Sequence, residues 1–241
     1  MDDSGRPHRV AIAHDWLTIP GGSEKVVARM LRMFPQAEIF TSVYDPAPWP
    51  PVITSRPVHT SFLNRIPGAT RNYPRMLPLM NAAFESFDFT GFDLVLSSSH
   101  ACARAVRVGP HVAHVSYTHA PMRYAWEFDL EKDRFPSWTH PIVRPMMAAF
   151  RRWDRRNAQR VDVLCANSRD IAGRMAARTA RGAANAVAGQ ARSARYEREV
   201  GRSAHDVCSQ RACAELRHKS VTTDGSSGHR VMLTITQVAV A

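Results

Sequence analysis

Lysine is scarce in this chain of 241 residues, in which only three of the 32 basic residues are lysines. The other basic residues are arginines, and the formal net charge is +11. A charge of this size raises the question of nucleic acid or an anionic membrane as a partner. Such a strong preference for arginine over lysine is also typical of a GC-rich coding sequence. The charge therefore predicts no specific nucleic-acid partner.

Long apolar runs and paired cysteines are missing as well. No apolar run approaches the roughly 20 residues that a helix needs to cross a bilayer, and the polar start of the chain is unlike a secretory signal. We expect a cytoplasmic protein, with peripheral contact at the inner face of the cytoplasmic membrane as an open alternative. The cysteines show no CxxC spacing, which favours free thiols over disulfides or metal ligands. They are Cys102, Cys165, Cys208 and Cys213.

Aromatic residues and proline almost disappear after residue 176. All ten phenylalanines, all five tryptophans and all sixteen prolines precede this point, and Tyr196 is the only Phe, Trp or Tyr residue that follows it. Too little apolar surface remains there to offset the entropy lost when a chain is ordered. We therefore expect a flexible N-terminus over residues 1–8, a folded domain over residues 9–176 and a disordered tail over residues 177–241.

Within residues 9–176, short apolar runs alternate with segments of helical periodicity. The expected strands are Val10–Ala13, Glu38–Thr41, Leu94–Leu96, Val112–Tyr117 and Val161–Cys165, and the expected helices are Ser23–Met33, Tyr73–Ser86, His140–Gln159 and Arg169–Met175. The Pro-rich stretch Pro46–Pro57 is typical of a surface loop. Such alternation predicts an α/β fold, a Rossmann-like parallel sheet with flanking helices, followed by the tail.

The first strand, Val10–Ala13, leads into the most informative stretch of the sequence. Two polar residues, His14 and Asp15, follow it, and Gly21 and Gly22 then precede an amphipathic helix. This junction places backbone N–H groups and the positive end of a helix at the carboxyl edge of a parallel sheet, where phosphates bind. The alternative is a plain strand-to-helix turn.

Several segments together resemble the N-terminal half of a family 4 glycosyltransferase, of the mannosyltransferase-like bacterial branch that builds surface polysaccharides. They are Arg9–Leu17, Gly21–Val27, Phe34–Pro35, Ile39–Thr41, Asp93–His100, Tyr117–Trp126, Arg160–Asp162 and Ala166–Ser168. The resemblance covers residues 9 to about 176. It implies one half of a GT-B fold, in which two Rossmann-like halves face each other across a cleft and the N-terminal half mainly receives the acceptor.

The resemblance stops where the composition changes. In the family a second domain follows, which grips the nucleotide-sugar, and no segment like it is recognisable in residues 177–241. We expect a truncation or frameshift near residue 176 to have replaced that domain, and we expect these 241 residues alone to be inactive or nearly so. The expected partners are a nucleotide-sugar donor and a saccharide or lipid-linked acceptor, without specific nucleic acid.

The resemblance also suggests roles for individual residues. His119 would hydrogen-bond the donor sugar or stabilise charge at its anomeric carbon. Donor phosphates would face Gly21, Gly22 and Arg123, and the acceptor would meet Asp15, His100 and Tyr124. Retaining enzymes of the family lack a well-defined protein nucleophile, so none is assigned. We expect no metal and no cofactor.

Structural roles that involve no substrate are the alternatives for several residues. Glu24 would complement the dipole of the first helix, Ser99 would cap a helix after the third expected strand, and Arg123 would form an ordinary salt bridge. The arginines of the helix over residues 141–160 fit a solvated face, or contact with acidic lipid headgroups. His111, His114 and His119 span a strand, a poor spacing for zinc.

Two other classes of protein compete with the glycosyltransferase. One is a noncatalytic Rossmann-like module that binds anionic ligands in a partial cleft. The other is a nicotinamide oxidoreductase, which is disfavoured because Gly21 and Gly22 do not form a GxGxxG pattern.

Overall fold

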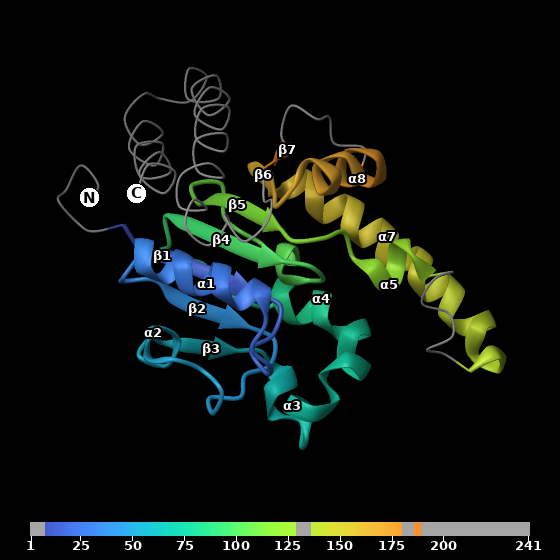
Figure 1. Cartoon of the computed structure of the whole chain (residues 1–241), viewed down its shortest axis with the longest axis horizontal. Helices are drawn as coiled ribbons and strands as arrows, with labels where there is room; N and C mark the ends of the chain where they lie inside the picture. Colours follow the sequence, from blue (N-terminus) through green and yellow to red (C-terminus); the bar gives the residue numbers. More distant parts are fainter. Residues whose placement is uncertain (1–7, 129–135, 180–185, 189–241) are drawn as a thin grey trace, which may run out of the picture.

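The computed structural model describes residues 8–128, 136–179 and 186–188. Its strands form one parallel sheet in the order β3-β2-β1-β4-β5-β6-β7, with helices packed against it (Figure 1). The strands are β1 (Val10–His14), β2 (Glu38–Thr41), β3 (Val58–Thr60), β4 (Leu94–Ser99), β5 (Ala113–Thr118), β6 (Val163–Ala166) and β7 (Ala186–Ala188). This architecture confirms the predicted Rossmann-like α/β fold.

The helices connect successive parallel strands. They are α1 (Gly22–Met33), α2 (Pro51–Thr54), α3 (Ala69–Asn72), α4 (Leu77–Glu85), α5 (Arg123–Trp126), α7 (His140–Arg160) and α8 (Arg169–Thr179). Short 3-10 helices are η1 (Phe62–Arg65), η2 (Tyr73–Met76), η3 (Ala103–Ala105) and η5 (Ser137–Thr139). No helix in the described ranges is long and apolar enough to cross a membrane.

The side chains of β1 alternate between two apolar layers, as strand geometry requires. Val10 and Ile12 pack into the cluster that contains Leu31 of α1. Ala11 and Ala13 pack into the opposite cluster, together with residues of α4, η3 and α7. Every side chain of β1 is buried, as expected for a central strand covered on both faces. The alternation fixes the face on which each polar residue at the end of the strand emerges.

The expected strands and helices are present, with differences at their ends. The strand expected over Leu94–Leu96 continues through Ser99, because β1 and β5 satisfy its backbone on both sides. The helix expected over Tyr73–Ser86 is divided into η2 and α4, and each part has a proline near its start. Pro51–Thr54 forms a short helix inside the expected Pro-rich loop.

Two short parts of the expected tail are described, and both belong to regular structure. The helix expected to end at Met175 runs to Thr179, and Ala186–Ala188 pairs in parallel with β6. The rest of the expected tail, with Cys208 and Cys213, and residues 1–7 of the expected flexible N-terminus lie outside the described residues. Cys102 and Cys165 are buried free thiols.

Candidate functional site

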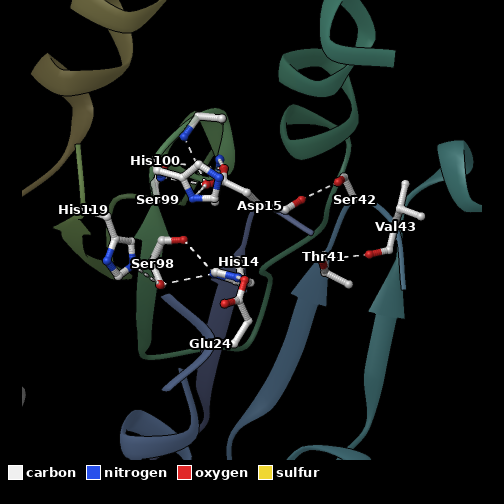
Figure 2. A network of polar contacts seen from close by, with 12 residues as sticks. His14, Asp15, Glu24, Thr41, Ser42, Val43, Ser98, Ser99, His100 and His119 are labelled. Atoms are coloured by element: carbon white, nitrogen blue, oxygen red, sulfur yellow. Dashed lines mark hydrogen bonds and ion pairs between the residues drawn. The ribbon is translucent and has the colours of Figure 1, made fainter. Parts of the chain in front are cut away.

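The strand order reverses between β1 and β4, because the chain moves outward to β2 and β3 before it returns. In open parallel sheets, such a switch point leaves a crevice outside the carboxyl ends of the strands, and ligands bind there. The polar residues His14 and Asp15 end β1, and Ser98 and Ser99 end β4, so all four lie at this edge. Figure 2 shows them together with Glu24, His100 and His119.

Asp15 is fully buried and holds the loop after β4. Its carboxylate accepts hydrogen bonds from four successive backbone N–H groups, which belong to His100 at 2.7 Å, Ala101 at 3.0 Å, Cys102 at 2.7 Å and Ala103 at 2.6 Å. Burial alone would raise the pKa of Asp15, but the charges of His100 and His14 and the backbone N–H groups outweigh it and lower the pKa. The carboxylate is thus a fixed anion inside the protein.

This geometry changes the expected roles of Asp15 and Ser99. Both Asp15 oxygens already accept two backbone N–H groups each, and the side chain has no exposed surface for an acceptor. Asp15, which directly follows β1, caps the N–H groups at the start of η3. The hydroxyl of Ser99 is only a distant donor to the same carboxylate, at 3.4 Å. Asp15 therefore positions the loop that carries His100.

Glu24 pairs with His14 on the other face of the sheet. His14 Nε2 lies 3.1 Å from Glu24 Oε1, and both side chains are buried. Burial alone would raise the pKa of Glu24, but the hydrogen bond and charge of His14 outweigh it and lower the pKa. The role predicted for Glu24, which is to complement the helix dipole, does not include its contact with His14.

Gly21 is the residue before α1 and Gly22 is its first residue, and the two glycines have different surroundings. Gly21 has extended backbone geometry, with a φ of −152°, which any residue can adopt. A Cβ at Gly21 would lie 2.9 Å from Glu24 Oε2, so this glycine makes room for the buried carboxylate. A Cβ at Gly22 would meet nothing within 4 Å. The fold therefore does not require a glycine at position 22.

His119 lies just beyond β5 and joins the same polar cluster. Its Nε2 is 2.8 Å from Ser98 Oγ, and its backbone N–H donates to the carbonyl of Ser99 at 2.9 Å. Burial, and after it the charges of His14 and His100, lower the pKa of His119 to about 4, against the opposing effect of Asp15 and Glu24. His119 is therefore a neutral ring at physiological pH.

His100 is a partly exposed histidine at this edge, whereas His14 is fully buried. The side chain of His100 is 28% exposed, and Nδ1 lies 3.1 Å from Asp15 Oδ2. The ring packs edge-on against Trp16, and its centroid is 6.4 Å from that of His119. A ligand at the switch point can thus reach His100 and His119 together.

Arg123 and Tyr124 lie on α5, the short helix after β5. Arg123 is exposed and sits 3.7 Å from Glu127 on the same helix, whereas Tyr124 packs against the larger apolar cluster. Asp154 of α7 anchors α5, because its carboxylate accepts a hydrogen bond from Trp126 Nε1 at 2.7 Å. Asp154 also forms a buried ion pair with Arg104. The expected salt bridge of Arg123 is present, and the side chain of Arg123 is 62% exposed.

The clustered histidines and carboxylates do not form a metal site. In the described part of the chain, no group of three or more His, Cys, Asp or Glu side chains is arranged to hold a metal ion. The arrangement instead offers hydrogen-bond donors to an oxygen-rich ligand: backbone N–H groups at the start of α1, and ring nitrogens of His100 and His119.

The fold defines a Rossmann-like domain with a cluster of polar side chains at its switch point. The family model of Glycosyltransferase Family 4 matches residues 20–182, more than half of the chain. The chain therefore belongs to glycosyltransferase family 4, and the matched part corresponds to the N-terminal domain of that family. The resemblance inferred from the sequence is confirmed at this level. A search of curated proteins finds no match to this chain.

The residues with the clearest contacts to His119 were not singled out as site residues from the sequence. From the sequence, Ser98 is indistinguishable from Ser97 and Ser99, and His14 stands out only by its position after an apolar strand. The register pairs His14 with Ser98 directly, so both side chains emerge on the α1 face, where Glu24 arrives. Counting in steps of two from Val10 and Leu94 indicates this face from the sequence, once the two strands are known to be neighbours.

Proposed function

We propose that this domain forms the acceptor-side wall of a sugar-transfer cleft. The reaction would move a mannose-like sugar from a nucleotide-sugar to a saccharide or lipid-linked acceptor in the synthesis of cell-surface polysaccharide. The observation that carries the proposal is the polar cluster at the switch point of a family 4 domain, where His100 and His119 lie next to each other.

The roles that we propose for individual residues are those that the family resemblance implies. His119 is a hydrogen-bond donor to a hydroxyl of the donor sugar and stabilises charge near the anomeric carbon. The N–H groups around Gly21 and Gly22, with the guanidinium of Arg123, face the diphosphate. His100 and Tyr124 contact the acceptor. Asp15, buried beneath His100, supports the loop and takes no direct part.

We further propose that transfer needs a second, donor-binding half, and that these 241 residues alone transfer sugar weakly or not at all. The frameshift near residue 176 stays a hypothesis for the change in composition there. Reading the coding DNA in the other two frames past codon 176 tests it. A Pro-Pro-Val-Asp type segment and a donor motif in one of those frames would support it, and their absence would refute it.

A peripheral contact with the inner membrane belongs to the same proposal. Trp138 of η5 is 77% exposed and Ile142 in the first turn of α7 is 70% exposed, and Arg152 and Arg156 lie exposed further along α7. Exposed aromatic and aliphatic side chains beside arginines suit an interface of acidic lipids. A lipid-linked acceptor would then reach the cleft from the membrane surface.

Calorimetric titration of the 241-residue chain tests the proposed function. We expect a mannose-terminated glycan to bind, and GDP-mannose or UDP-glucose to bind much more weakly or not at all. Tight binding of a nucleotide-sugar without any glycan binding would favour a noncatalytic module for anionic ligands. Measurable sugar transfer by the chain alone would contradict the need for a second half.

A further inference from the structure

Four side chains form a continuous chain of hydrogen bonds on the α1 face of the sheet. Figure 2 shows it running from Glu24 through His14 and Ser98 to His119. Glu24 comes from α1, His14 and Ser98 end the neighbouring strands β1 and β4, and His119 follows β5. His14 and Ser98 are direct partners in the strand register, so the fold fixes the centre of the chain.

The position of the hydrogens on His14 follows from its partners. Nδ1 lies 3.0 Å from the carbonyl oxygen of Ser98, which can only accept, so Nδ1 carries a hydrogen. Nε2 lies 3.1 Å from Glu24 Oε1, and the lowered pKa of Glu24 keeps that group ionised at neutral pH. Both nitrogens of His14 therefore face acceptor oxygens, and the contact of Nδ1 with the Ser98 carbonyl fixes a hydrogen on Nδ1.

The direction of the Ser98 hydroxyl then follows. Ser98 Oγ lies 3.2 Å from His14 Nδ1, which already carries a hydrogen and cannot accept another. The single hydroxyl hydrogen of Ser98 is left for His119 Nε2, at 2.8 Å. Nε2 of His119 is thus the acceptor, and the hydrogen of this neutral ring sits on Nδ1. The burial and nearby positive charge that lower the pKa of His119 to about 4 agree with a neutral ring.

We propose that Ser98, His14 and Glu24 are positioning residues that hold His119 as a neutral ring with its hydrogen on Nδ1, which donates to a sugar hydroxyl. Nδ1 makes no hydrogen bond to any residue within 8–128, 136–179 or 186–188. A neutral N–H group suits an uncharged hydroxyl and lacks the charge that would draw a phosphate. The identity of the ligand group rests on the proposed function, whereas the position of the hydrogen does not.

Side-chain nitrogen spectra of the 15N-histidine-labelled full chain at neutral pH test this arrangement without any ligand. We expect His119 to show a protonated Nδ1 and an unprotonated Nε2, and His14 to show a protonated Nδ1. A protonated Nε2 on His119, or an unprotonated Nδ1 on His14, would overturn the proposal.

Substitution of Ser98 separates a positioning role from a packing role. Ser98→Ala removes the donor, so the Nε2–H form of His119 should appear, and Ser98→Thr, which keeps a hydroxyl, should restore the wild-type pattern. Ser97→Ala is the matched control, because Ser97 Oγ lies 2.9 Å from Nε2 of the buried His114. It should leave the His119 signals unchanged. An unaltered Nδ1–H form in folded Ser98→Ala would show that Ser98 does not position the ring.

Failure of the proposed function would look different. If the apo spectra match and neither GDP-mannose nor a mannose-terminated glycan shifts the His119 nitrogens, the positioning chain stands but its sugar ligand is refuted. If a sugar binds next to a His119 ring protonated on Nε2, the proposed function stands and the positioning chain is refuted.

Discussion

His14 and Asp15 are neighbours in the sequence, but they serve two different regions of the molecule. Asp15 faces the layer of η3 and α7, where backbone N–H groups saturate its carboxylate. His14 faces α1, where a second buried carboxylate, that of Glu24, reaches His119 only through side chains. The carboxylate of Asp15 is held by backbone N–H groups and fixes a loop. The carboxylate of Glu24 is linked through side chains to His119 and helps to set the position of the hydrogen on that ring. The same edge of the sheet therefore contains a structural anion and a ligand-facing chain.

The largest expected effect is the loss of the structural anion. Asp15→Asn places an amide NH2 group against backbone N–H donors and leaves some of them unsatisfied. We expect the free energy of unfolding to fall by about 3 kcal/mol or more, measured by urea denaturation. Ser99→Ala, which removes only a 3.4 Å contact to the same carboxylate, is the control and should cost less than about 1 kcal/mol. Equal stabilities of Asp15→Asn and wild type would remove the distinction between the two carboxylates.

Acid should weaken the two regions in different pH ranges. The unfolded chain protonates His119 below pH 6.5, but the folded protein resists this until about pH 4, so stability falls as pH drops through that window. The loss attributable to His119 is at most about 3 kcal/mol. The pKa of Asp15 is lowered, so its contribution is present above pH 3.8 and is lost on further acidification.

His119→Gln isolates the first of these windows. Urea denaturation at several pH values should give a flatter dependence between pH 4 and 6.5 for this variant than for wild type, with similar behaviour below pH 3.8. Parallel curves for the two proteins over the upper window would mean that His119 is not shielded from protonation.

The two glycines of the first loop should respond differently to alanine. Gly21→Ala pushes on Glu24 Oε2 and should lower the free energy of unfolding by about 1 kcal/mol, because the carboxylate must shift within a buried pair. Gly22→Ala should stay within about 0.5 kcal/mol of wild type, since its Cβ enters open space at the start of a helix. Thermal unfolding compares their stabilities directly.

Gly22→Ala should matter for ligand binding although it should hardly change stability. If the diphosphate approaches the start of α1, Gly22→Ala in an enzyme that includes the donor-binding half should reduce sugar transfer while the protein stays folded. An unchanged transfer rate would leave Gly22 without a ligand-binding role.

The smallest effect on stability is expected at Arg123. Its ion pair with Glu127 is long and its side chain is 62% exposed, so Arg123→Ala should change the free energy of unfolding by less than about 0.5 kcal/mol. A larger loss in a urea titration would place Arg123 in the structural region and not on the ligand side.

The sequence predicted the strands that carry the site, because buried parallel strands have nearly continuous apolar runs. The family resemblance also implied that His119, His100 and the Gly-Gly loop face the substrates. The roles of Asp15 and Glu24 could not be read from the sequence, since each depends on a partner from another element: the amides of residues 100–103 for Asp15, and His14 for Glu24. The strand Val58–Thr60 was missed because it is short and follows a proline-rich segment.

The most direct test of the ligand-facing side is a ligand titration monitored at the histidine side chains. In 15N-histidine-labelled protein, a mannose-terminated glycan should shift the nitrogens of His100 and His119, which border the switch point, and leave those of the buried His114 unchanged. If His100 and His119 stay unmoved while the glycan binds elsewhere on the domain, the sugar site is not at this edge of the sheet.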